Sequence, residues 1–131
     1  MPDQPQVPDE PPSSSLAKRV RSFVIPRLDE LATRLRAARH KTLVDDRLDD
    51  DEARIRFRLV PWKGPFEEAP TVSDSVLEIA VDEGGGVVVR YWLDGTADEP
   101  SVESHFDDEK IGARWCERVL LDFVELTLAA A

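Results

Sequence analysis

The sequence has one cysteine, two histidines and no long apolar run, and each shortage excludes a class of protein. Cys116 has no partner in the chain for an internal disulfide, and lone buried cysteines usually behave as small hydrophobes. A membrane span needs about 18 consecutive apolar residues, and no stretch approaches that length. Met1 to Ser15 carries acids but no base, unlike the positively charged start of a secretory signal. We therefore expect a cytoplasmic protein.

Residue patterns that carry chemistry are also scarce. No Cys–His or Ser–His–Asp arrangement and no set of three or four zinc ligands can be assembled from spacing. The acidic segment Asp45 to Glu52 lacks the glycine and the final glutamate of a calcium-binding loop. Gly84 to Gly86 joins two β-rich segments, whereas a phosphate-binding loop leads into a helix. The sequence predicts a protein that is not an enzyme, with no catalytic residue, cofactor site or metal site.

The charge is divided unevenly along the chain. The protein carries a net charge of −10, yet eight of its 17 Lys and Arg residues lie between Leu16 and Val44. On a helical wheel these bases surround an apolar stripe and do not form one patch, which DNA binding would prefer. This distribution favours a helix that packs in the fold or pairs with another helix, whose flanking positions carry charge.

The length of 131 residues is typical of one domain. Residues 1–15 contain five prolines and few apolar side chains, so they cannot bury enough surface to offset the entropy of ordering. We expect a disordered Pro-rich tail over 1–15 and a single α+β domain over 16–131.

A long amphipathic helix is expected from Leu16 to Val44. Apolar residues recur at alternating spacings of four and three from Val24 to Ala38, which is one face of a helix. Pro26 interrupts this pattern, so either one helix is kinked there or a second helix starts there. A kinked long helix is the favoured interpretation, followed by an acidic loop from Asp45 to Glu52.

Four strands should follow, because the apolar period changes from about four to two. The first strand, around Ile55 to Leu59, alternates apolar residues with arginines. Val76 to Asp82 and Val87 to Asp94 flank the glycine turn and predict a β-hairpin. Ser101 to Phe106 is a weaker fourth strand.

The chain should end in a second helix, capped by Asp107 with Asp108 and Glu109 in its first turn. Its apolar face is widened by Leu121, Leu126 and Leu128, so it needs burial on more than one side. The predicted fold is α-β-β-β-β-α: a Pro-kinked helix, a four-stranded antiparallel sheet and a C-terminal helix packed on the sheet.

Two apolar surfaces are candidate binding sites. Leu28, Leu31 and Leu35 lie on the apolar stripe of the first helix and could pair with another helix. Val88 and Trp92 lie on the second face of a strand that is apolar on both faces. Either each face of the sheet has a helix over it, or one face is a subunit interface. We expect a protein-protein interaction domain, acting as an adaptor, chaperone-like or regulatory protein and forming a homodimer.

The alternative function is binding of single-stranded nucleic acid. Arg56, Arg58, Arg90 and Trp92 are expected on the outer sheet face, where arginines neutralise phosphates and an aromatic side chain stacks on a base. Glu78 and Asp82 are expected on the same face, and opposite charges on neighbouring strands pair with each other. Those acids make nucleic acid the less favoured partner.

Overall fold

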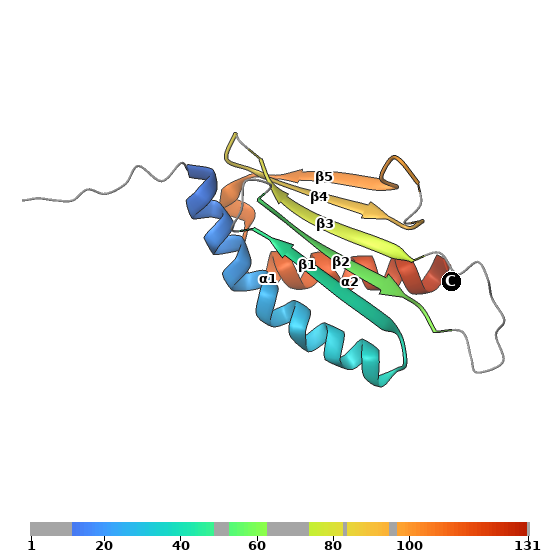
Figure 1. Cartoon of the computed structure of the whole chain (residues 1–131). Coiled ribbons are helices and arrows are strands. Elements are labelled where there is room, and N and C mark those ends of the chain that lie inside the picture. Colours follow the sequence, from blue (N-terminus) through green and yellow to red (C-terminus); the bar gives the residue numbers. More distant parts are fainter. Residues whose placement is uncertain (1–11, 49–52, 63–73, 83, 95–96, 131) are drawn as a thin grey trace, which may run out of the picture.

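The computed structural model describes residues 12–48, 53–62, 74–82, 84–94 and 97–130. These residues form two α-helices, five strands and one short 3-10 helix, an α+β fold (Figure 1). The elements are α1 (Pro12–Ala37), β1 (Lys41–Arg47), β2 (Arg54–Val60), β3 (Ser75–Val81), β4 (Val87–Trp92), β5 (Val102–Phe106), η1 (Asp108–Lys110) and α2 (Ala113–Ala130).

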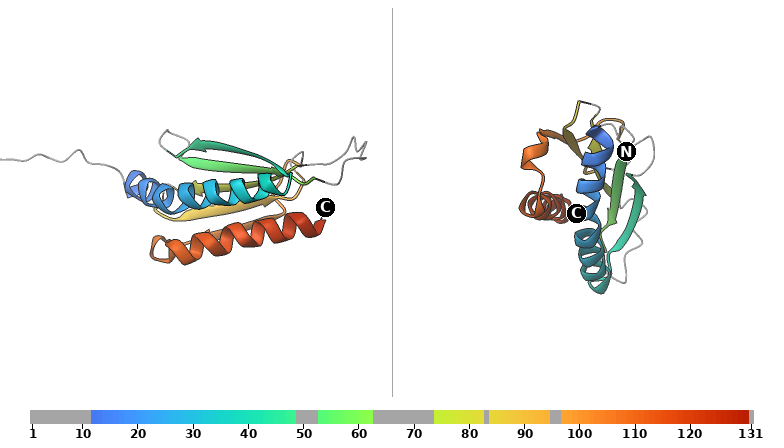
Figure 2. Two further views of the ribbon diagram at one scale, coloured as in Figure 1. Left: turned by 90° about the horizontal axis from the view of Figure 1, so that it is seen from below. Right: turned by 90° about the vertical axis from the view of Figure 1, so that its left-hand side faces the viewer.

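The sheet is a simple antiparallel meander. Its spatial order is β1-β2-β3-β4-β5, so every strand pairs with its neighbours in sequence. Both helices lie on the same side of β1 and β2 (Figure 2), and α2 passes behind the strands in Figure 1. We call the side that faces the helices the inner face and the opposite side the outer face.

The hydrophobic core lies between the inner face and the two helices. In β2 the alternation expected from the sequence is observed, because Ile55, Phe57 and Leu59 are at most 1% exposed while the intervening arginines point outward. Phe123 of α2 packs edge-on against Phe57, with ring centroids 6.1 Å apart, and lies 5.6 Å from the ring of Tyr91. Burial of these side chains holds α2 on the sheet.

The predicted hairpin of β3 and β4 is confirmed, with Val81 opposite Val87. The amide of Gly85 donates to the carbonyl of Asp82, and the amide of Asp82 donates to the carbonyl of Gly86. Gly85 has φ +94°, which costs glycine little and an L side chain more. A Cβ at Gly86 would lie 3.0 Å from the carbonyl oxygen of Phe106 in β5.

The number of strands differs from the prediction. The first helix ends at Ala37, and Lys41–Arg47 forms β1 where the sequence favoured the end of the helix and an acidic loop. Arg39 has φ 73°, so a non-glycine residue makes the left-handed turn between helix and strand. Residues 49–52 of the expected loop lie outside the described residues.

The ends of the two helices also differ from the prediction. One continuous helix runs through Pro26, but it begins at Pro12 and not at Leu16, so residues 12–15 belong to α1. Residues 1–11 of the predicted tail lie outside the described residues. Asp107 caps the short 3-10 helix η1 without a side-chain hydrogen bond, and α2 begins only at Ala113.

Candidate functional site

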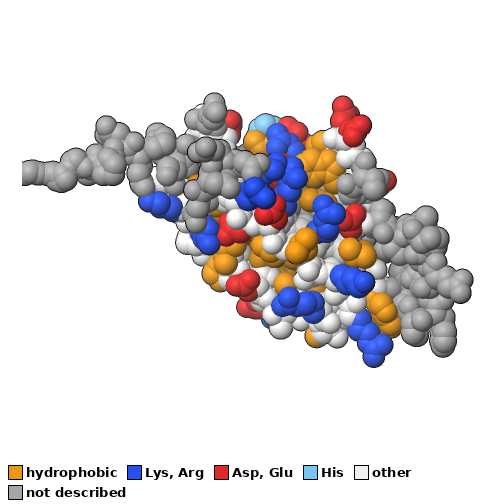
Figure 3. All heavy atoms as spheres, in the orientation of Figure 1, with side chains coloured by type: hydrophobic (Ala, Val, Ile, Leu, Met, Phe, Trp, Pro, Cys, Tyr) orange, Lys and Arg blue, Asp and Glu red, His pale blue; other side chains and the backbone are white. Residues whose placement is uncertain are grey.

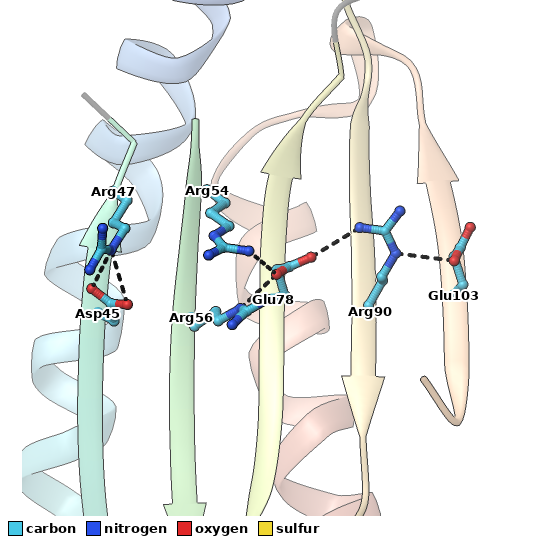
Figure 4. A network of polar contacts seen from close by, with 7 residues as sticks. All are labelled: Asp45, Arg47, Arg54, Arg56, Glu78, Arg90 and Glu103. Carbon is cyan, nitrogen blue, oxygen red and sulfur yellow. Dashed lines mark hydrogen bonds and ion pairs between the residues drawn. The ribbon is translucent and has the colours of Figure 1, made fainter. Parts of the chain in front are cut away.

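The outer face is built around one buried carboxylate, Glu78. Its residue is only 3% exposed, and three arginines surround it (Figure 4). Arg56 donates to one carboxylate oxygen at 2.7 Å, Arg90 donates to the other at 3.0 Å, and Arg54 lies at 3.5 Å. A buried charge is stable only when it is paired and hydrogen-bonded, and these contacts meet both conditions.

The strand register explains why these side chains meet. Asp45, Arg56, Glu78, Arg90 and Glu103 occupy one row across all five strands, alternating acid and base. Residues directly opposite each other on one face of neighbouring strands are close enough to form ion pairs. We call this row the charge ladder.

The outer end of the charge ladder is exposed to solvent. Arg90 also donates to Glu103 at 3.1 Å, and Glu103 contacts the His105 ring at 3.0 Å. The hydrogen bond from Arg90, followed by the one from His105, lowers the pKa of Glu103. Burial opposes the charge of Arg90, but its hydrogen bonds to Glu103 and Glu78 outweigh that effect and raise its pKa. These charges satisfy one another along the sheet.

The residues proposed for nucleic-acid binding lie on this face, but none of the arginines is unpaired. Arg58 donates to Asp74 at 2.6 Å, while Arg56 and Arg90 share Glu78. The Arg56 guanidinium lies 5.9 Å from the ring centroid of Trp92. Arg56, Arg58 and Trp92 border a small hollow of about 260 Å³. Figure 3 shows the basic side chains of this face interspersed with acidic and apolar ones.

The residues proposed for partner binding are separated by the fold. Leu28 and Leu35 are 1% and 7% exposed and belong to the core of their own chain. Leu31 is only partly buried and lines a groove between α1 and α2. On the outer face Val88 is 7% exposed, and Trp92 is partly exposed. Leu31 and Trp92 thus keep accessible apolar surface, whereas Leu28 and Leu35 do not.

The groove between the helices has a volume of about 600 Å³. Arg27 and Glu117, 3.5 Å apart, lie on its two walls, and Glu30 pairs with Arg34 at 2.9 Å along α1. Leu121 on the α2 wall is 60% exposed. We call this feature the helix groove.

Leu128, one heptad beyond Leu121 on the same face of α2, is 40% exposed. The sequence pattern indicates that the apolar face of α2 is wider than one packing contact can cover. Only the structure shows that Leu121 and Leu128 remain uncovered, because that depends on how α1 packs.

A second hollow of about 510 Å³ lies between β5 and α2 on the other flank of α2. Its lining includes the aromatic side chains of Tyr91, Phe106 and Trp115. The Tyr91 hydroxyl donates to the carbonyl of Val119 at 3.2 Å. Burial, assisted by the negative charge of Asp122, raises the pKa of Tyr91, so this side chain stays a hydrogen-bond donor.

Cys116 lies in the core between the two helices. It is 0% exposed, and its thiol contacts the carbonyl of Phe23 in α1 at 3.6 Å. Burial raises the pKa of its thiol to about 11, an effect that Arg27 opposes and Glu117 adds to. Its environment is that of a packing residue.

Within the described ranges, no group of three or more His, Cys, Asp and Glu residues could hold a metal ion. The same part of the chain contains no helix with the length and apolarity of a transmembrane span. Comparison with family models, with curated proteins and with solved structures finds no match to this chain.

Proposed function

We propose that this chain is a non-enzymatic protein-protein interaction domain that forms a homodimer through the helix groove. One observation carries the proposal: Leu121 and Leu128 are 60% and 40% exposed on one face of α2, beside a groove to which Leu31 contributes. Burying a fully exposed leucine stabilises by about 1.5–3 kcal/mol, so covering Leu121 and Leu128 contributes roughly half of that for each, and two-fold symmetry doubles the contribution.

The charges at the groove are compatible with self-association. Arg27 and Arg34 are matched in number by Glu30 and Glu117 around the rim. A two-fold interface brings the same patch of both subunits together, so a patch that carries both signs can pair with itself. The overall net charge of −10 opposes association, and a locally balanced rim reduces that opposition.

The outer face supplies the second contact surface of this proposal. Trp92 is partly exposed there, beside Val88, which is 7% exposed, and both helices pack on the opposite side of the sheet. A homodimer formed through the helix groove leaves the outer face of each subunit free. An adaptor, chaperone-like or regulatory role uses that face for another protein.

The mass in solution tests the dimer. Light scattering should give twice the 14.7 kDa mass of one chain, and Leu121→Asp should return the protein to 14.7 kDa at the same concentration. Leu43→Asp is the matched control, because Leu43 on β1 is 62% exposed, almost the same as Leu121. A wild-type monomer at every concentration, or a Leu121→Asp dimer of unchanged affinity, would contradict the proposal.

Single-stranded nucleic acid is the weaker alternative because Arg56, Arg58 and Arg90 already pair with acids. It requires quenching of Trp fluorescence by an oligonucleotide at low salt, with an affinity that falls as salt rises. Trp92→Phe should remove most of that signal, whereas Trp62→Phe, an exposed control 42% accessible, should not. Quenching that follows this pattern would replace the protein-binding proposal for the outer face.

A further inference from the structure

The edge strand β5 and the part of α2 beside it form a surface that shares no lining residue with the helix groove. Among the described residues β5 pairs with β4 alone, so its second edge is not hydrogen-bonded by any of them. An open strand edge carries a row of backbone N–H and C=O groups that can pair with another extended chain. Val102, at the start of this strand, is 37% exposed.

The hollow beside this edge has an apolar floor and a basic wall. Phe106 of β5 and Trp115 of α2 pack edge-to-face there, with ring centroids 5.7 Å apart. Lys110, Arg114 and Arg118 line the hollow at intervals of four residues. All three are exposed, and they form no ion pair with any residue in the described part of the chain. Asp122 continues the same row.

The bases beside β5 differ from those of the outer face. The arginines of the outer face are paired, and the whole chain carries a net charge of −10. Three adjacent bases therefore mark a place where a negatively charged partner would be attracted against the prevailing charge. One further group lacks a partner at this site: the buried indole Nε1–H of Trp115 has no acceptor among the described residues. Leaving a buried donor unsatisfied is costly, and an acceptor on a bound segment would remove that cost where the ring turns its N–H toward the hollow.

We propose that this surface binds an extended acidic segment of a partner protein, which adds to β5 as a sixth strand. The backbone of the segment pairs with the open edge of β5, and alternate apolar side chains enter the hollow toward Phe106 and Trp115. Its carboxylates meet Lys110, Arg114 and Arg118. This site and the helix groove share no lining residue, so a monomer can use it, and a dimer can use it where Arg114, one heptad before Leu121, stays uncovered.

Fluorescence anisotropy with a labelled synthetic peptide of alternating Glu and Val tests the proposal. The full-length protein should bind this peptide, and affinity should fall with rising salt. Arg114→Glu combined with Arg118→Glu should weaken binding at least about tenfold, the effect of losing one or two charge-assisted hydrogen bonds. Arg36→Glu combined with Lys18→Glu makes the same change of net charge on exposed positions of α1 and should leave binding intact.

Two further measurements separate strand addition from general attraction of an anion. A version of the peptide with every backbone amide N-methylated has no N–H to donate from either edge, and it should bind far more weakly. Trp115→Phe removes the unpaired N–H while keeping an aromatic ring, and it should weaken binding roughly three- to tenfold. Amide hydrogen exchange of β5 should slow when the unmodified peptide is bound.

The proposal is overturned if the folded protein does not bind the peptide at low salt, or if the charge reversal on α2 leaves affinity unchanged. Equal binding of the N-methylated peptide would mean an anion site without strand pairing. The amide protection of β5 against hydrogen exchange could instead rise with protein concentration and stay unchanged when peptide is added. That result would mean that a second copy of the chain occupies the edge. A neutral change, Leu121→Asn, separates this site from the proposed dimer without adding an acid three residues from Arg118, because a monomeric variant should still bind the peptide.

Discussion

The two faces of the sheet are stabilised by different interactions. On the inner face, side chains such as Phe57, Ile79 and Leu59 are at most 1% exposed and belong to the hydrophobic core. On the outer face, Glu78 is buried almost as deeply, at 3%, but its partners are three arginines. The same strands therefore hold a hydrophobic core on one side and an ion-pair network on the other.

This difference indicates which surfaces remain for binding. The side chains of the inner face are buried in the core, and the charged side chains of the outer face mostly pair with one another within the sheet. Accessible groups remain around α2: exposed leucines at the helix groove, and beside β5 three bases that form no ion pair with the described residues. The final helix, more than the basic first helix, presents the available surface.

Truncating the centre of the inner face should produce the largest loss of stability. Phe123→Ala removes a fully buried ring that contacts Phe57 and Tyr91, and it should lower the free energy of unfolding by about 3–5 kcal/mol. Urea unfolding followed by circular dichroism measures this change. A loss below about 1 kcal/mol would mean that the inner face is not the main source of stability.

Neutralising the centre of the outer face should have a smaller effect. Glu78→Gln keeps the shape but leaves Arg54, Arg56 and Arg90 without their shared anion. These arginines are 28–39% exposed, so hydration partly compensates for the lost ion pairs. We expect the free energy of unfolding to fall by about 1–3 kcal/mol. Glu103→Gln, at the exposed end of the charge ladder, should change stability little. Equal effects at the two positions would contradict the role of burial.

The hydrogen bond of the Tyr91 hydroxyl, on the inner side of the sheet, should contribute still less to the free energy of unfolding. Tyr91→Phe removes the hydrogen bond from the hydroxyl to the carbonyl of Val119 and keeps the ring against Phe123. The expected loss is about 0.5–1.5 kcal/mol in the same urea assay. A gain in stability would show that the hydroxyl is better satisfied in the unfolded chain than in the fold.

The pH dependence of Cys116 should be small but of definite sign. Its thiol has a pKa of about 11 in the fold against 9.0 ordinarily, so the unfolded chain loses the proton first as pH rises. Stability contributed by the protonated thiol is therefore complete below pH 9 and declines between 9 and 11. Cys116→Ala should flatten that part of the pH profile of unfolding, and a folded protein at pH 8 should react slowly with a thiol reagent. Rapid labelling of the native protein would contradict burial of Cys116.

Much of the fold could be predicted from periodicity. The alternation around Ile55 to Leu59 predicts the strand β2, and the glycine turn at Gly85 predicts the hairpin of β3 and β4, because side-chain spacing reports directly on which face is buried. The strand Lys41–Arg47 was missed because its edge position lets it carry acids: Asp45 faces solvent, and Asp46 pairs with Arg21 of α1. Its turn is made by Arg39, where no glycine, proline or asparagine marks the end of the helix.

The binding surfaces were less predictable than the fold. Arg56, Glu78 and Arg90 were correctly expected on one face, but their convergence depends on the strand register. Leu28 and Leu31 share one stripe of α1, yet only the packing of α2 decides that Leu28 is buried and Leu31 borders the helix groove. A one-dimensional pattern identifies apolar faces and does not indicate which part of a face remains uncovered.

The central claim, that the α1–α2 side of the fold is the surface through which two copies associate, can be tested directly by isotope-filtered NMR. In a mixture of labelled and unlabelled chains, we predict contacts between subunits from the methyl groups of Leu31, Leu121 and Leu128, which border the helix groove or lie on its α2 face. A stable dimer without such contacts, or with contacts from Val88 and Trp92 in their place, would contradict it.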